Sequence, residues 1–373
     1  MITLSLCMIV KNEEDVLGRC LSCMDGIADE IVIVDTGSTD RTREIALQFT
    51  SKVYDFPWRD DFAAARNFAF SKATMDYTLW LDADDVIDEE NRAKFLALKR
   101  ELPESADMVM MKYDVAFDAQ GRPTLSYYRE RLFRTSRHFQ WVGEIHEVVP
   151  QQGEVLYRDI HVLHKKLHPT EQGRNLRIFE KMLSEGKTLD PRQKFYYARE
   201  LMYNRNIPDA ILRFTEFLDE GRGWVENNIG ACKDLASCYA LMGDGEAALT
   251  SLLRSFTYDV PRAEICCDLG KLFFDREQYR MAAYWYEQAS RCSMVDTNGG
   301  FCLSDCYGYI PYMQLCVCYD RLGDKKTARE FNEKAGRLKP DDPGYLYNRA
   351  YFQRQAAAQG DTDSGQTVSK HGE

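Results

Sequence analysis

Apolar and polar residues alternate in blocks along the N-terminal part of the chain. Short apolar runs are separated by amphipathic stretches up to about residue 165, as in α/β proteins. The apolar runs predict buried strands at 4–10, 30–35, 52–56 and 78–82. The amphipathic stretches predict helices at 12–24, 41–49, 66–74 and from 86 onward. Because the strands are runs of Val, Ile and Leu joined by helical crossovers, we expect a mostly parallel, Rossmann-like sheet covered on both faces.

Polar residues mark the predicted starts of two of these helices. Asn12 is a candidate cap for the first helix, with Glu13 and Glu14 in its first turn. Asp88, Glu89 and Glu90 are expected near the start of the helix that follows the fourth strand. Acidic residues at a helix N-terminus have this ordinary structural explanation.

Beyond Pro169 the pattern becomes purely helical and contains an internal repeat. Four blocks match the spacing of small and aromatic residues in tetratricopeptide repeats, where each small residue lets two helices approach closely. The matching positions are Tyr197, Ala198, Leu201, Ala210 and Phe214; Leu235, Ala236, Tyr239, Ala248 and Leu252; Leu269, Gly270, Phe273, Ala282, Tyr286 and Ala289; and Tyr312, Leu315, Cys316, Tyr319, Ala328, Ala335 and Pro340. An irregular helical bundle is the alternative interpretation.

The repeat spacing also predicts where extra residues are inserted. The equivalent alanines at 210, 248, 282 and 328 lie 38, 34 and 46 residues apart, and only the middle value is the regular 34. We therefore expect insertions around 221–230 and 293–306. The predicted organisation is a domain at 1–168, a helical repeat domain at 169–354, and a tail at 355–373 that lacks apolar periodicity and is expected to be disordered.

Composition and charge narrow the classes of function. The 373 residues include 45% hydrophobic residues, enough for sizeable cores, and carry a net charge of −11 with no long basic tract, which argues against nucleic acid as a partner. The 12 cysteines show no metal-ligand spacing and are expected to be reduced, buried thiols, which favours a cytoplasmic protein. No signal peptide is expected at the N-terminus, and no apolar stretch has the length of a membrane span.

The stretch LWLDADD, residues 79–85, ends an apolar run in a cluster of carboxylates. Asp82 and Asp84, two positions apart beyond a strand end, can converge on Mg²⁺ or Mn²⁺, which take hard oxygen ligands. Such ions are usually held by one or two carboxylates together with substrate phosphates, so the site implies a nucleotide diphosphate or a similar ligand. A helix N-terminus is the alternative, although Asp82 still belongs to the predicted strand.

Two neighbouring stretches add candidate ligand groups. Asp35 ends the second strand in VDTGSTDRT, where it can accept hydrogen bonds from a base or a ribose. Arg66 begins the next predicted helix and can pair with a phosphate. A surface ion pair of Arg66 with Asp60 or Asp61 is the alternative interpretation.

Taken in order, SLCMIVKNEEDVLGRCL, DEIVIVDTGSTDRTREIA, DFAAARNFAF and LWLDADD resemble family 2 glycosyltransferases of the GT-A fold. The resemblance resumes in RLFR, FQWVGEIHEVV and the strand ending in HVLHKK, and so covers most of residues 1–170. It is closest to the β-glucosyltransferase-like, bacterial-type branch that carries tetratricopeptide helices, which includes glycocin-type peptide S-glycosyltransferases.

The resemblance implies roles for individual residues in nucleotide-sugar binding. Val10 and Lys11 would lie against the base, with Asn12 beside them, and Asp35 would hold the base or ribose. Arg66 would approach the base or diphosphate.

It also implies a metal site. Asp82 and Asp84 match the DxD motif of the family, Asp84 as the direct ligand and Asp82 reaching the ribose or a metal-bound water. His164, at the end of the last strand, is a candidate third ligand. Asp85 is expected at the edge of the site, as a helix-start residue.

The stretch GEIHE contains the candidate general bases. An inverting sugar transfer needs a carboxylate to take the proton of the acceptor. The resemblance favours Glu147, with His146 orienting it or touching phosphate. Glu144 is the alternative, because alternation along a strand would place Glu144 and His146 on one face and Glu147 on the other.

The sequence therefore predicts an inverting, metal-dependent hexosyltransferase that uses a UDP sugar, UDP-glucose or UDP-GlcNAc, with Mn²⁺ or Mg²⁺. The concave surface of helical repeats favours an extended peptide or protein acceptor. The alternatives are a saccharide or lipid-linked cell-surface glycan as acceptor, or a scaffold that binds a sugar nucleotide without catalysis. A homodimer is a further expectation from the repeats.

Overall fold

The computed structural model describes residues 1–168, 171–295 and 299–364. The chain divides into two compact units, one formed by 1–231 with 295–302 and the other by 232–294 with 303–373. Residues 365–373, which belong to the predicted tail, lie outside the described part of the chain.

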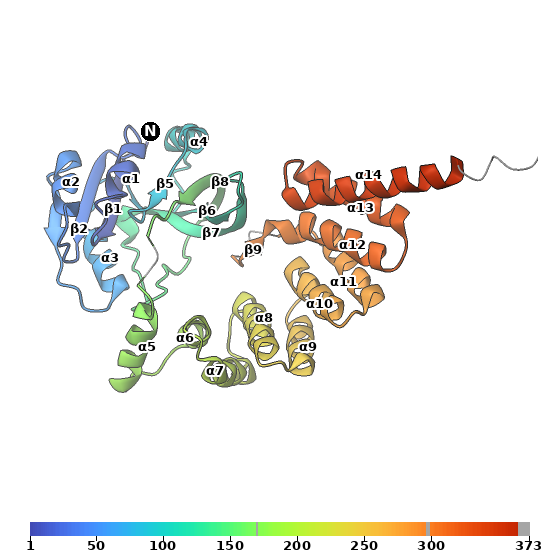
Figure 1. Cartoon of the computed structure of the whole chain (residues 1–373). Coiled ribbons are helices and arrows are strands. Elements are labelled where there is room, and N and C mark those ends of the chain that lie inside the picture. The colour runs from blue at the N-terminus through green and yellow to red at the C-terminus, as the bar shows by residue number, and fades with distance from the viewer. Residues whose placement is uncertain (169–170, 296–298, 365–373) are drawn as a thin grey trace, which may run out of the picture. The chain divides into compact units, whose positions relative to one another are not determined.

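The first unit contains a mixed sheet with helices packed around it (Figure 1). Its strands are β1 (Leu4–Val10), β2 (Glu30–Asp35), β3 (Val53–Asp55), β4 (Tyr77–Trp80), β5 (Asp85–Val86), β6 (Met108–Phe117), β7 (Pro123–Arg134) and β8 (Val155–His164). Its first helices are α1 (Leu17–Cys23), α2 (Thr42–Phe49), α3 (Phe62–Phe70) and α4 (Glu89–Glu101). The strand order is β3-β2-β1-β4-β7-β6-β8-β5.

The four strands predicted from apolar runs form the parallel part of this sheet. β1 pairs in parallel with both β2 and β4, and β2 with β3, so these carboxyl ends share one edge. The side chains of β1 and β2 are almost wholly buried, which explains their continuous apolar sequence. The sequence did not predict that β7 runs antiparallel between β4 and β6.

Several helix starts differ from the predicted ones. The first helix begins only at Leu17, and Asn12 does not cap it: Asn12 has a left-handed backbone (φ 55°), and its side chain accepts a hydrogen bond from Thr39 instead. The third helix begins at Phe62 with Asp61 as its cap, so Arg66 lies in its middle rather than at its start. The predicted acidic start of the fourth helix is confirmed.

Asp88 is the cap of that fourth helix and accepts a hydrogen bond from the backbone N–H of Asn91. The first turn of α4 then contains Glu89 and Glu90. A negative charge at this end of a helix is stabilising because unpaired N–H groups point toward it.

The described part of the chain after β8 is mostly helical. Its helices are α5 (Arg174–Ser184), α6 (Pro191–Tyr203), α7 (Ile207–Glu220), α8 (Val225–Leu241), α9 (Gly245–Arg254), α10 (Ala263–Asp275), α11 (Tyr279–Arg291), α12 (Tyr309–Arg321), α13 (Lys325–Leu338) and α14 (Pro343–Ser364). Short 3-10 helices lie at Thr135–Arg137, Ser255–Thr257 and Ser304–Tyr307, and a short strand, β9, at Cys302–Leu303. The last helix, α14, extends into the segment expected to be a disordered tail.

The helices pack as the predicted repeats require. α6 packs with α7, α10 with α11, and α12 with α13. The alanines at 210, 282 and 328 are buried in α7, α11 and α13 of these pairs, and Ala248 is buried in α9, which contacts α10. A Cβ atom at Gly270 would lie 2.8 Å from the ring of Tyr286, so the approach of α10 to α11 requires glycine there.

The prediction of reduced, mostly buried cysteines is confirmed, since all of them are free and only Cys23 and Cys292 are partly exposed. Within the described ranges, no helix has the length and apolarity needed to cross a membrane.

Candidate functional site

The loops after β1 and β2 are fastened to each other. Asp35 ends β2, lies level with Val10 of β1, and accepts hydrogen bonds from the backbone N–H groups of Gly37 (3.1 Å) and Ser38 (2.8 Å). The turn requires glycine at 37, where φ is 107°. Asn12 joins it by donating its backbone N–H to the hydroxyl of Ser38 (3.0 Å). The structure thus brings Val10, Asn12 and Asp35 together at the sheet edge.

Lys11 lies between Val10 and Asn12 in this loop and is exposed. Lys11 directly follows β1, and its exposed side chain is free to contact a nucleotide base, as the resemblance implies. Its role remains a prediction.

The acidic turn after β4 is built around Asp85, which is fully buried. Its carboxylate accepts hydrogen bonds from the backbone N–H of Asp82 (3.0 Å), the hydroxyl of Tyr113 (2.9 Å) and the guanidinium of Arg131 (3.1 Å). Arg131 is itself fully buried between the rings of Trp80 and Tyr113. The expectation that Asp85 starts a helix at the edge of the site is therefore wrong: it lies in β5 and anchors the turn.

Asp84 and His164 meet beside Asp85. β5 pairs with β8 so that Asp85 lies opposite His164, and the His164 Nδ1 atom is 3.3 Å from a carboxylate oxygen of Asp84 and 3.2 Å from one of Asp85. One ligand atom from each of the three lies within 4.8 Å of the others. In the part of the chain that the structure describes, this is the one group of acids, histidines and cysteines spaced to hold an ion.

The donor set of this group fits a divalent cation. Carboxylate oxygens suit Mg²⁺ and Mn²⁺, and an imidazole nitrogen is a common ligand of transition metals. Burial alone lowers the pKa of His164, but its hydrogen bonds to Asp84 and Asp85 and their charges raise it to about 10. In the metal-free protein a proton on His164 therefore neutralises part of the charge that a cation would otherwise balance.

Arg66 connects the acidic turn to the loop that carries the candidate bases. Its guanidinium is buried between Trp80 and Trp141 and donates to Asp82 (2.8 Å) and to Glu147 (2.7 Å). Burial raises the pKa of Asp82, but the charge and hydrogen bond of Arg66 outweigh this and lower it to about 2. Asp82 thus points to Arg66 rather than into the group of Asp84, Asp85 and His164.

The predicted alternative, a surface ion pair of Arg66 with Asp60 or Asp61, does not form. Asp60 pairs with Lys181 (2.6 Å), and Asp61 is the cap of α3. Arg66 lies five residues beyond Asp61, which turns it about 140° around the helix from that residue, and it is buried.

The stretch GEIHE forms a loop rather than a strand, so the alternation argument for Glu144 does not apply. The loop is closed by the paired backbones of Val142 and Val148 and has left-handed residues at Gly143 (φ 95°) and His146 (φ 51°). A non-glycine residue in this region costs on the order of 1–3 kcal/mol and needs support from its surroundings. At His146 the support comes from Tyr196, on which its ring stacks, and from Glu200, which lies within hydrogen-bond distance of its ring.

The three candidate residues of the loop have different neighbours. Glu147 contacts Arg66. Glu144 instead accepts hydrogen bonds from Lys187 (3.1 Å) and Gln193 (3.3 Å), on the side of the helical region. His146 also faces the helical region, so Glu147 is the candidate base that adjoins the acidic turn.

Glu13 is a residue of the site that the sequence did not reveal. Burial raises its pKa to about 7, together with the charges of Asp84 and Asp82. Glu13 lies three residues beyond the end of β1, at the same edge of the sheet as the acidic turn after β4. This position in the sequence could have indicated that Glu13 belongs to the site. The indication was concealed by the assignment of Glu13 to the first turn of a helix. Arg131 and Tyr113 were missed because no local pattern indicates which carboxylate they bind.

Comparisons with known proteins agree with this geometry. Residues 5–153 match the family model described as Glycosyl transferase family 2. A TPR repeat-containing protein of Synechococcus elongatus is 36% identical over 149 residues, which are 40% of this chain and 36% of that protein. The glycosyltransferase SunS of the SPbeta prophage of Bacillus subtilis is 28% identical over 228 residues, which are 56% of this chain and 51% of SunS. The chain thus spans about half or less of the length of these relatives.

Among solved structures, a glucosyl-3-phosphoglycerate synthase from Mycobacterium tuberculosis aligns over 51% of this chain and 81% of its own, with 12% identity and a TM-score of 0.36. The MamA protein aligns over 43% of this chain and 79% of its own, with a TM-score of 0.34. At these scores neither likeness adds to what the geometry shows. Residues 5–153, which include the acidic strand end, thus match the model of family 2 glycosyltransferases, and helices follow this matched region.

Proposed function

We propose that this chain is an inverting, metal-dependent glycosyltransferase that moves a sugar from a nucleotide donor, UDP-glucose or UDP-GlcNAc, to a peptide or protein. The observation that carries the proposal is the meeting of Asp84, Asp85 and His164 at the same sheet edge as the Asp35 turn. In this proposal the anionic group would hold the ion, and the Asp35 turn at the same edge would receive the base or ribose. Both are the parts that a nucleotide-sugar site needs.

Within this proposal each group has a chemical task. Asp84 and His164 would hold Mn²⁺ or Mg²⁺, which offsets the charge that grows on a leaving diphosphate. Asp35 and the loop containing Asn12 would hold the nucleoside. Arg66 would keep Asp82 ionised and oriented at the same edge.

Glu147 is the proposed general base. It would take the proton from the acceptor nucleophile as the new bond to C1 forms and the bond from C1 to the diphosphate oxygen breaks. The Arg66 hydrogen bond uses its Oε1 atom and fixes the orientation of the carboxylate. A single displacement at an axial donor carbon gives the equatorial, β-linked product.

The similarity to SunS and the helical repeats support a peptide or protein acceptor over a saccharide or lipid-linked glycan. A donor screen addresses the sugar directly.

We expect the purified chain to hydrolyse UDP-glucose or UDP-GlcNAc slowly, with UDP released only when Mn²⁺ or Mg²⁺ is present. The measurement is UDP release by chromatography with each metal and with EDTA, alongside GDP-mannose and dTDP-glucose. Thermal shifts with the same panel report binding without turnover. Stronger stabilisation by the GDP sugar would overturn the choice of donor, and equal turnover in EDTA would overturn the metal requirement.

We also expect Mn²⁺ affinity to rise about tenfold per pH unit between pH 6 and pH 8, because the ion must displace the proton from His164. The pKa of that histidine is about 10, so it is protonated across this whole range. Titration calorimetry of Mn²⁺ at several pH values measures the slope. A His164→Gln variant should bind more weakly with a flatter slope; an unchanged slope would show that His164 is not a ligand.

A further inference from the structure

The loop 142–148 is held from two sides, both within the first unit. On one side it is fastened to α3: the backbone N–H of Phe62 donates to the carbonyl of Glu144 (2.9 Å), and Asn67 exchanges two hydrogen bonds with the backbone of Trp141 (2.8 and 3.0 Å). These contacts hold the N-terminal half of the loop. They do not involve His146, at its left-handed turn.

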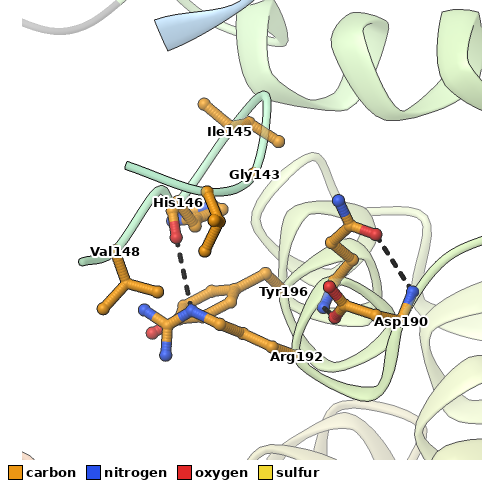
Figure 2. A pocket seen from close by; sticks show the side chains of 9 residues that line it. Gly143, Ile145, His146, Val148, Asp190, Arg192 and Tyr196 are labelled. Carbon is orange, nitrogen blue, oxygen red and sulfur yellow. Dashed lines mark hydrogen bonds between the residues drawn. The ribbon is translucent and has the colours of Figure 1, made fainter. Parts of the chain in front are cut away.

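The other side of the loop is held by one face of α6. Arg192, Tyr196 and Glu200 are spaced four residues apart, so all three project from the same side of the helix. The His146 ring stacks on Tyr196, with centroids 4.1 Å apart and planes 12° from parallel. Arg192 donates from Nε to the carbonyl oxygen of His146 (3.3 Å), and Figure 2 shows this bond with the Tyr196 ring beside it.

Glu200 also contacts the imidazole ring of His146. Its carboxylate lies 3.0 Å from Nε2 of His146 and also accepts a hydrogen bond from Asn175 of α5 (3.0 Å). Glu200 is buried, which raises its pKa, but the hydrogen bonds from His146 and Asn175 outweigh burial and lower the pKa overall. Glu200 is therefore ionised and fixes Nε2 of His146 as the donor.

His146 directly precedes Glu147, whose side chain contacts Arg66 on the opposite side of the loop. A peptide that is left-handed at His146 and held there by its ring, its carbonyl and its neighbours leaves little freedom for the next side chain. A shift of about 1 Å in a reacting group can lower a rate on the order of 100-fold. The α6 contacts are thus placed to set the position of the proposed base.

We propose that Glu200, acting through His146, is a positioning residue for sugar transfer, so that α6 of the helical region is part of the catalytic apparatus of the sheet domain. This inference rests on the proposed function, in which Glu147 is the base. It assigns Glu200 no contact with substrate. Its effect is on the geometry of the loop.

The test compares Glu200→Ala and Glu200→Gln with the wild-type chain. We expect Glu200→Ala to lower kcat by about 10- to 100-fold, with the KM for the nucleotide sugar changing less than about threefold, since the donor is held at the other loops. Glu200→Gln keeps a hydrogen-bond acceptor and should recover part of the loss. Glu264→Ala is the matched control.

Glu264 is another buried glutamate, in the second unit, whose carboxylate accepts hydrogen bonds from the backbone of Leu303 (2.9 Å) and the hydroxyl of Tyr307 (3.0 Å). Its replacement by alanine lowers stability without touching the loop, so kcat should stay unchanged. If kcat fell as much in this control, general destabilisation would explain the loss in Glu200→Ala, and the proposal would be overturned. Full activity in folded Glu200→Ala would likewise overturn the proposal.

A second comparison uses His146. If Glu200 acts through it, the double variant Glu200→Ala/His146→Ala should be no slower than the slower single variant, whereas independent roles would give multiplied losses. Hydrogen exchange of the Val148 amide, which pairs with Val142, reports the loop without any assay of transfer. Suppose that the wild-type chain turns over no donor, but that the Val148 amide exchanges faster in Glu200→Ala than in the wild type. The positioning contact would then be supported, and only the proposed function would be rejected.

Discussion

Replacing Asp84 by asparagine is expected to lower metal-dependent turnover of the nucleotide sugar by about 100- to 1,000-fold, the range seen when one group that stabilises developing charge is removed. Asparagine keeps the size of the side chain but removes the negative charge that draws a cation to His164. Asp84 is partly exposed and contacts His164, so the fold should persist. UDP release at varied Mn²⁺ concentration measures both the loss and the weaker metal activation.

The matched control for this change is Asp88→Asn, four residues further along. Asparagine caps a helix nearly as well as aspartate, so α4 should keep its start and activity should not change. If Asp84→Asn responded to Mn²⁺ as the wild type does, the site formed by Asp84, Asp85 and His164 would not be the metal site.

Replacing Arg66 by methionine is expected to have the largest effect on stability, a loss of about 3–5 kcal/mol in the free energy of unfolding. Methionine fills the space between Trp80 and Trp141 but leaves Asp82 and Glu147 without their shared partner. Urea unfolding followed by tryptophan fluorescence reports this region. Arg43→Met, which removes an exposed ion pair with Asp55, should cost less than about 1 kcal/mol.

The Arg66 effect should also depend on pH in a defined direction. The pKa of Asp82 is lowered to about 2, below its value in the unfolded chain of about 3.9, so its ion pair stabilises the fold above pH 4 and this contribution is lost as the pH falls toward 2. The difference between wild type and Arg66→Met should therefore shrink in acid. A difference that stayed constant down to pH 3 would indicate lost packing rather than lost charge pairing.

The sequence predicted the parts of the fold that depend on local pattern. β1 and β2 have the predicted limits because almost every position in them is buried, and the repeat alanines are buried where the spacing placed them. The start of the first helix was wrong because Asn12 is held by Thr39, which is 27 residues away. Such a partner leaves no trace in the residues around Asn12.

The same distinction applies to the candidate site. The strand ends that carry Asp35 and Asp84 could be predicted, because parallel strands deliver their last residues to one edge. The role of Asp85 could not, since its burial depends on Arg131, which is 46 residues away on β7. The neighbours of Glu144 and Glu147 depend on the backbone of a loop whose turn at His146 is set by α6.

The burial of Asp85 has a consequence for how tightly ligands can bind. The turn from Asp82 to Asp85 is closed by its own backbone hydrogen bond and by the Asp85 carboxylate, without any ligand. The conformational entropy of these residues is thus lost when the chain folds and not when a ligand arrives. A ligand at this turn meets a rigid surface, so its binding free energy is not reduced by the ordering of the loop that receives it.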